Sequence, residues 1–164
     1  MAFAAKGRAL RLAGALVAVL AIAACAKNPA EDGGLAGAGG YAAPGSPQDF
    51  VVNVGDRVFF ESDSTDLTPQ SVATLEKQAQ WLQSYNRYAF TIEGHADERG
   101  TREYNIALGA RRAQAVRDYL ASRGIDASRM KTISYGKERP VAVCNDISCW
   151  SQNRRAVTVL NATS

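Results

Sequence analysis

The sequence lacks a surplus of charge of either sign. Its 19 Lys and Arg stand against 16 Asp and Glu, and three of the basic residues, Lys6, Arg8 and Arg11, fall within the first 24 residues, which contain no acid. The other 140 residues therefore carry 16 basic and 16 acidic groups. Because binding to nucleic-acid phosphates requires an excess of cations, this neutral body argues against nucleic acid as a partner.

A long hydrophobic run is also missing near the N-terminus. The apolar stretch from Leu12 to Ile22 has 11 residues, whereas a helix that spans a bilayer needs about 20. Basic residues before a short apolar run are typical of a secretory signal peptide, which we assign to residues 1–24. Small residues before Cys25 resemble the lipobox of bacterial lipoproteins and predict lipidation of Cys25, with several acyl chains as a stable membrane anchor. Ordinary secretion with cleavage elsewhere is the alternative.

The next segment is rich in glycine and proline and nearly free of aromatic residues. Between Pro29 and Pro47, six Gly and three Pro occur in 19 residues. Such a composition cannot bury enough apolar surface to offset the entropy lost on ordering. We therefore predict a flexible tether over residues 25–48, which joins the lipidated Cys25 to a folded domain over residues 49–164.

Cysteine and histidine are scarce in that domain. Cys144 and Cys149 are separated by four residues, which suits a small disulfide-closed loop in an oxidising compartment. A metal site is the alternative interpretation, but the domain has no further cysteine, and its single histidine, His95, lies 49 residues before Cys144. We predict a candidate disulfide here, and neither a metal nor a cofactor.

Strand-like and helix-like patterns alternate from residue 50 onward. Thr68-Pro69 opens one helix, and Thr101 starts the longest helix, which extends to about Ser122 before Gly124 ends it. Runs of β-branched and aromatic residues predict four strands, over residues 51–60, 88–93, 130–135 and 155–160. This order predicts an α/β (α+β) sandwich, with a mixed parallel and antiparallel sheet and two main helices on one face.

The long helix carries two adjacent arginines that are not equivalent. At 3.6 residues per turn, one stripe of the helix packs on the sheet; its members are Ile106, Gly109, Ala113, Val116 and Leu120. Arg111 points away from this stripe, whereas Arg112 lies at its border with Asn105 and Leu108. Because a helical arginine side chain leans toward the helix N-terminus, Arg112 is expected to approach the loop that contains Asp97.

These residues predict a site with one anion and one cation. Asp97, Arg112 and the free backbone N–H groups of Gly100 and Thr101 suit a zwitterion, whose ammonium would bind Asp97 and whose carboxylate would bind Arg112. The alternative is that Asp97 and Arg112 pair with each other and tie the loop to the helix. The spacing favours neither interpretation.

Three segments resemble a known family: GHADERGTREYNIALGARRA (94–113), SYGKERP (134–140) and QNRRAV (152–157). They are similar to the OmpA-like C-terminal domain family, and above all to its Pal-like lipoproteins of Gram-negative bacteria. The family's helix pattern, Asn-x-x-Leu-Ser-x-x-Arg-Ala-x-x-Val-x-x-x-Leu, is matched with Gly109 in place of Ser, as is usual in Pal-like members. The matching residues are Asn105, Leu108, Arg112, Ala113, Val116 and Leu120.

The resemblance implies non-covalent binding of peptidoglycan through the meso-diaminopimelate of its stem peptides, which ends in a free ammonium and carboxylate. It assigns recognition to Asp97 and Arg112. The other matching positions are Asp63, Gly100, Thr101, Asn105 and Leu108. Glu61 and Asp66 lie in the same segment as Asp63 and could exchange roles with it.

The resemblance also implies a second partner and a location. Pal-like proteins bind the periplasmic β-propeller protein of the Tol system through a surface that overlaps the peptidoglycan site, so the two partners compete. Together with Ala26 after the lipidated Cys25, this predicts a lipid-anchored protein at the periplasmic face of the outer membrane. It would tether that membrane to the cell wall as part of the Tol-Pal system and support constriction at division. Many family members lack the Cys144 and Cys149 pair.

An enzyme that acts on peptidoglycan is the alternative function. His95 is the only candidate proton shuttle, and a hydrogen-bonded structural histidine is the favoured interpretation. Asp97 and Glu98 are a poor acid and base pair, since neighbouring side chains diverge. Arg154 and Arg155 are expected to cap sheet edges or pair with nearby acids. We therefore predict binding without catalysis.

Overall fold

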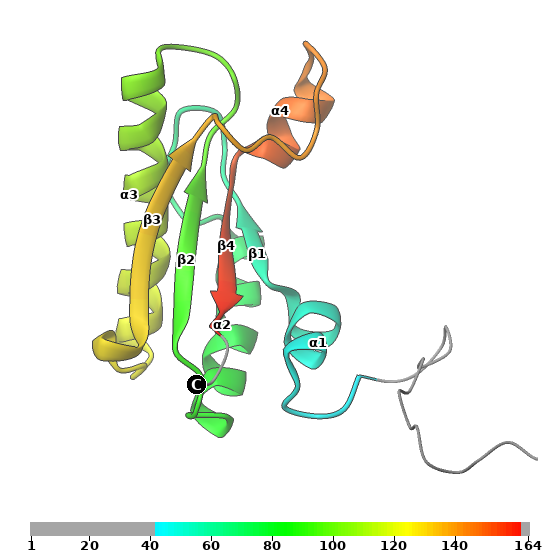
Figure 1. Cartoon of the computed structure of the whole chain (residues 1–164), viewed down its shortest axis with the longest axis vertical. Coiled ribbons are helices and arrows are strands. Elements are labelled where there is room, and N and C mark those ends of the chain that lie inside the picture. The colour runs from blue at the N-terminus through cyan, green and yellow to red at the C-terminus, as the bar shows by residue number, and fades with distance from the viewer. Residues whose placement is uncertain (1–41, 162–164) are drawn as a thin grey trace, which may run out of the picture. The chain divides into compact units, whose positions relative to one another are not determined.

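The computed structural model describes residues 42–161, so the predicted signal peptide, Cys25 and most of the predicted tether lie outside the described residues. The long helices lie on one side of a four-stranded sheet, behind it in Figure 1. The strands are β1 (Arg57–Phe59), β2 (Phe90–His95), β3 (Met130–Gly136) and β4 (Arg155–Leu160). The helices are α1 (Pro47–Asp49), the π-helix η1 (Phe50–Gly55), α2 (Pro69–Ser84), α3 (Arg102–Ser122), the 3-10 helix η2 (Ala127–Arg129) and α4 (Ile147–Asn153).

The sheet has the order β1-β4-β2-β3 and mixed strand directions. β4 pairs antiparallel with both β1 and β2, while β2 pairs parallel with β3. Parallel neighbours need a crossover connection, and α3 supplies it between β2 and β3. The predicted mixed sheet with two main helices on one face is confirmed. No helix between residues 42 and 161 is long and apolar enough to cross a membrane.

The strand predicted over residues 51–60 is wrong in its first half, which forms η1. Phe50 is fully buried, and its ring centroid lies 4.9 Å from that of Trp81 on α2. The Asp49 carboxylate accepts hydrogen bonds of 2.8 Å from the Trp81 indole and from the Asn53 side chain. These contacts fix the segment as a helix, and Gly55, at φ 95°, then turns the chain into β1.

The folded part also differs from the predicted boundary at residue 48. Gly45 is buried: its N–H donates to Asp49, and its carbonyl accepts a 2.8 Å hydrogen bond from the Tyr88 hydroxyl. Ser46 caps α1 by accepting from the Asp49 N–H. Because these backbone groups are paired with the domain, residues 45–48 belong to it rather than to a flexible tether.

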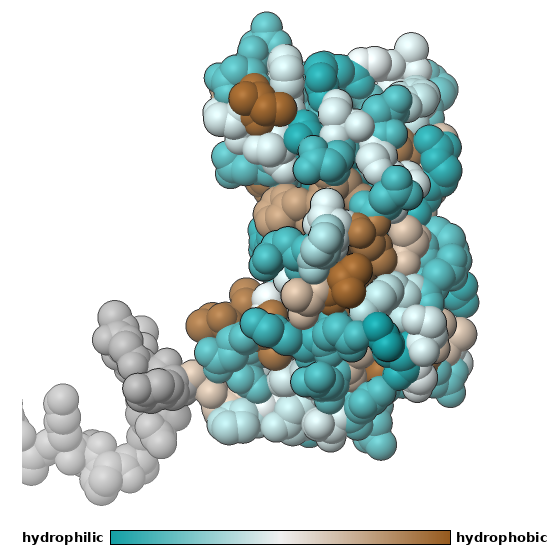
Figure 2. Space-filling model, turned by 180° about the vertical axis from the view of Figure 1, so that it is seen from behind, coloured by the Kyte–Doolittle hydropathy of each residue, from teal (hydrophilic) through white to brown (hydrophobic). Residues whose placement is uncertain are grey.

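Two glycines bring α3 unusually close to the sheet. A Cβ atom on Gly94 would overlap the carbonyl oxygen of Gly109, and one on Gly109 would clash with the Ser134 hydroxyl. The contact fixes the first half of α3 beside the end of β2, and hence positions the loop between them. Figure 2 shows the helix side of the molecule as mainly hydrophilic, with separate apolar patches.

Candidate functional site

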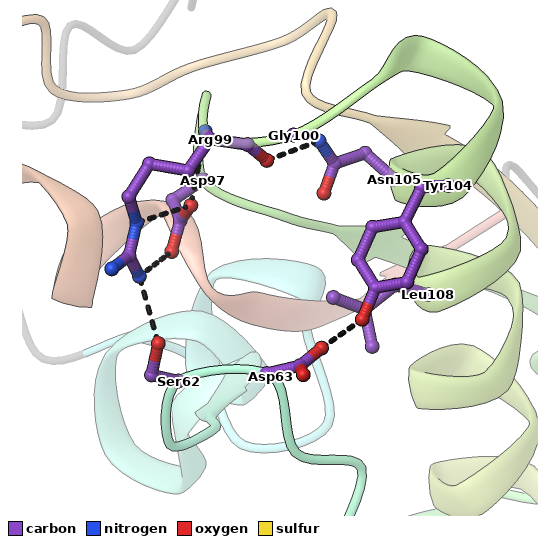
Figure 3. A pocket seen from close by; sticks show the side chains of 8 residues that line it. All are labelled: Ser62, Asp63, Asp97, Arg99, Gly100, Tyr104, Asn105 and Leu108. Carbon is purple, nitrogen blue, oxygen red and sulfur yellow. Dashed lines mark hydrogen bonds and ion pairs between the residues drawn. The ribbon is translucent and has the colours of Figure 1, made fainter.

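An open pocket of about 290 Å³ lies where the loop after β1 meets the loop after β2 and the first turns of α3. Figure 3 shows Asp97 and Arg99 on one side of it, and Tyr104 with Leu108 on the other. The lining residues are Ser62, Asp63, Asp97, Arg99, Gly100, Tyr104, Asn105 and Leu108. Five of the seven predicted binding residues thus meet at one pocket, while Thr101 and Arg112 are not part of its lining.

Asp97 is the main anion of the pocket, although only 7% of its surface is exposed. Its carboxylate accepts two hydrogen bonds from the Arg99 guanidinium, at 3.0 and 2.7 Å, and one from Arg154 at 3.4 Å. Burial disfavours its charged form, but the hydrogen bonds and charge of Arg99 outweigh burial and lower the pKa of Asp97 below its ordinary value. Asp97 is therefore ionised at neutral pH.

Arg112 approaches the loop that contains Asp97, as its spacing predicted, while its role in binding a carboxylate stays a prediction. Its side chain is fully buried, and its guanidinium donates to the carbonyls of Ser64 (3.0 Å), His95 (2.9 Å) and Glu61 (3.1 Å). Burial, and next the charge of Arg154, lower the pKa of Arg112 to about 10, so it stays charged at neutral pH. Arg112 thus joins the loop after β1 to the end of β2, and it does not line the pocket.

The predicted alternative, a pair between Asp97 and Arg112, is wrong. Among the residues that the structure describes, the ion-pair partners of Asp97 are Arg99 and Arg154. The helical period did distinguish the two adjacent arginines of α3, since Arg111 is exposed and Arg112 is buried. It could not show that the partners of Arg112 would be backbone carbonyls from distant loops.

Three pocket residues were not predicted from the sequence: Ser62, Arg99 and Tyr104. The Arg99 side chain is 43% exposed, so its charged end can meet a ligand, and it also donates to the Ser62 hydroxyl at 2.8 Å. The Tyr104 hydroxyl is hydrogen-bonded to the Asp63 carboxylate, which raises the pKa of Tyr104. The sequence contained a signal for Tyr104, because this residue lies one helical turn before Leu108, which was itself a predicted site residue.

Asp63 is the acid of its segment that reaches the pocket, while Glu61 and Asp66 do not line it. Asp63 has a φ of 56°, and it is the single residue other than glycine with a positive φ within residues 42–161. Left-handed backbone is costly outside glycine and is tolerated when the surroundings fix it. Of the three acids, Asp63 is thus the one that lines the pocket, while its part in ligand binding stays a prediction.

Hydrogen bonds within the turn that leads into α3 stabilise its shape. The buried Asn105 side chain donates to the carbonyls of Arg99 (2.7 Å) and Thr101 (3.1 Å), and Gly100 adopts a φ of 87°. Thr101 is the N-cap of α3, and its hydroxyl accepts from the Tyr104 N–H. Asn105 and Thr101 therefore hold the shape of the pocket, and the helix N-terminus adds a positive end beside it.

The ring of His95 is buried but is not hydrogen-bonded, so the prediction of a hydrogen-bonded histidine side chain is wrong. Both ring nitrogens are without a hydrogen-bond partner among the described residues, and 2% of the residue is exposed. Burial, followed by the charges of Arg155, Arg139 and Arg57, lowers the pKa of His95 to about 4. His95 is neutral at neutral pH and does not line the pocket, which gives no support to a proton shuttle there.

Arg154 and Arg155, at the start of β4, are both buried. Arg154 fits the prediction of pairing with a nearby acid, since it contacts Asp97 and also donates to the Phe60 carbonyl at 3.0 Å. Arg155 instead donates to the carbonyls of Asn153 (3.3 Å) and Arg139 (3.1 Å). Neither guanidinium forms an open anion-binding surface.

Three groups of known proteins share this sequence or fold. The model of the OmpA family matches residues 59–156. The peptidoglycan-associated lipoprotein of Rhizobium meliloti (strain 1021) is 68% identical over 149 residues, which cover 89% of this chain and 85% of the relative. The crystal structure of the peptidoglycan-associated lipoprotein from Burkholderia pseudomallei is 41% identical with a TM-score of 0.66, covering 71% of this chain and all of that one. The C-terminal domain of Helicobacter pylori MotB shares the fold at 22% identity and a TM-score of 0.61, covering 65% of this chain and 84% of that domain.

Proposed function

The chain belongs to the OmpA family and to its peptidoglycan-associated lipoproteins, and from this premise we propose that its folded domain binds peptidoglycan non-covalently through the pocket at the start of α3. The observation that supports this function is the meeting of an ionised carboxylate, Asp97, and a half-exposed guanidinium, Arg99, in one open pocket. Neither a histidine nor a cysteine is among the lining residues.

The ligand is the free end of meso-diaminopimelate, which carries an ammonium and a carboxylate on one carbon. The ammonium would bind Asp97, as predicted. The carboxylate would bind Arg99 rather than Arg112, because Arg99 has an exposed end, whereas Arg112 is fully buried and donates to three carbonyls. In the free protein Arg99 and Asp97 neutralise each other, so the ligand would open this pair and take both halves.

The remaining predicted residues have supporting roles in this proposal. Gly100 presents backbone beside the positive end of α3, where a carboxylate is favoured. Asp63, fixed by Tyr104, adds negative charge on the opposite side for the ammonium. Leu108 forms the apolar wall for the carbon chain of the ligand.

The membrane anchor and the second partner complete the proposal. Lipidated Cys25 would hold the chain in the outer membrane at its periplasmic face, and the segment that follows would let the domain contact the wall. The periplasmic β-propeller protein of the Tol system would compete for the same surface. Binding and release would then couple the outer membrane to the wall while the envelope constricts at division.

Purified sacculi test this function. We expect the full chain, in detergent, to co-sediment with sacculi that contain diaminopimelate and to be displaced by an excess of the soluble stem tripeptide that ends in meso-diaminopimelate. Soluble muropeptides should not appear during the incubation. Retention that the tripeptide does not reduce would refute the pocket, and released muropeptides would favour the enzyme.

A further inference from the structure

The segment around α4 lies beside the pocket but does not line it. Figure 1 shows α4 at the end of the sheet where β2 leads into α3. A disulfide joins Cys144 to Cys149, with a Cα–Cα distance of 5.7 Å, and closes the loop from which α4 starts. Asn153 ties the other end of α4 to the segment just before this loop, since its side chain accepts from the N–H groups of Val141 and Ala142. α4 is therefore fixed at both ends.

One side chain of α4 holds two consecutive residues of the pocket loop. The Trp150 indole N–H donates to the Glu98 carboxylate, and the Arg99 guanidinium carbon lies 4.3 Å from the centroid of the Trp150 ring. A guanidinium at this distance from an indole is attracted by the negative face of the ring. Trp150 thus contacts the residue to which we assign the ligand carboxylate.

The position of Arg99 on the ring limits the directions in which its donors can point. While the guanidinium carbon lies over the Trp150 ring, the N–H groups of Arg99 donate to Asp97 and Ser62. When a ligand ammonium takes Asp97, the ring still holds the guanidinium at the pocket with its edge free. Without the ring, a half-exposed arginine would adopt other rotamers in solvent, and binding would have to overcome that entropy.

We propose that Trp150, carried by the disulfide-closed α4 segment, is a positioning residue that orients Arg99 for the ligand carboxylate and so sets the preference of the pocket for free over amidated diaminopimelate. This inference rests on the proposed function, because it concerns the same pocket. It adds an element, α4 with Cys144 and Cys149, that does not line the pocket and still determines its specificity.

The test compares two stem tripeptides, one ending in free meso-diaminopimelate and one in which the distal carboxylate is a carboxamide. Titrated into the full chain in detergent, Trp150→Ala should weaken binding of the free acid by about threefold to tenfold and leave the amide unchanged, because the amide offers Arg99 no charge. Trp150→Phe keeps an aromatic face and should restore most of the affinity. In an Arg99→Gln background, Trp150→Ala should have no further effect.

A matched control is Tyr119→Ala, which removes a ring that carries Arg123 at 5.0 Å near the other end of α3 and should change neither affinity. The double variant Cys144→Ala, Cys149→Ala should weaken binding of the free acid and spare the amide, as Trp150→Ala does. Equal losses for acid and amide would show a merely structural role and overturn the inference. If the wild type binds the free acid and Trp150→Ala binds it equally well, the role of Trp150 is refuted but the proposed function stands. If the wild type binds neither peptide, the proposed function is refuted as well.

Discussion

Replacing Asp97 with Asn is expected to weaken binding to sacculi by at least tenfold. The substitution keeps the size of the side chain but removes the charge that the ligand ammonium requires. A hydrogen bond to a charged group contributes about 1.5–3 kcal/mol, and 1.4 kcal/mol corresponds to a tenfold change in affinity. Co-sedimentation of the variant over a range of sacculus concentrations measures the effect.

Asp66→Asn is the control, because Asp66 is an exposed acid near the same pocket that does not line it. Asp97 also pairs with two arginines, so the unfolding curve of each variant has to be measured. A folded Asp97→Asn variant that binds sacculi as well as the wild type does would contradict the assignment of the ammonium to Asp97.

Replacing Arg112 with Met is expected to lower the free energy of unfolding by about 3 kcal/mol. Three carbonyls, of Glu61, Ser64 and His95, would lose their donor, and each unpaired buried acceptor costs about 1 kcal/mol or more. Arg111→Met, on the exposed side of the same turn, should change stability by less than about 0.5 kcal/mol. Urea denaturation of both variants measures the difference.

Comparing stability with binding shows whether an Arg112 variant loses binding because the loops are destabilised or because a direct contact with the ligand is lost. If Arg112 only supports the loops, the weakened binding of a variant should follow its loss of stability and should affect free and amidated ligands alike. An Arg112→Met variant that is as stable as the wild type but no longer binds the free carboxylate would restore the direct role that the family resemblance implied.

Helical periodicity predicted the environment of the α3 residues well, because burial on a helix depends mainly on the angle around its axis. Arg111 and Arg112 are adjacent in the sequence, yet one is exposed and the other fully buried, as the 3.6-residue period predicts. The partners of Arg112 could not be predicted in the same way. Two of the three are backbone carbonyls about 50 residues earlier in the chain, and their position depends on how the loop after β1 folds.

In the N-terminal part of the domain, by contrast, the local sequence pattern predicted the wrong secondary structure. Its valines favour a strand, but the fate of the segment is decided by Asp49 and Phe50, which contact Trp81 on α2. A contact between residues more than 30 positions apart cannot be predicted from the pattern of neighbouring residues. The Ser46-Pro47 pair is a helix start signal that could have been used, since Ser is a favoured N-cap and Pro a favoured first residue.

The most direct test of the account is a titration of the wild-type chain with two stem tripeptides, one ending in meso-diaminopimelate and one in lysine, which lacks the distal carboxylate. Nuclear magnetic resonance would follow the backbone signals of Gly100 and Tyr104 and the side-chain signal of Arg99. We predict saturable shifts at these residues, with the lysine peptide binding at least tenfold more weakly. Equal affinities, or shifts confined to other parts of the domain, would contradict a pocket that recognises the zwitterion.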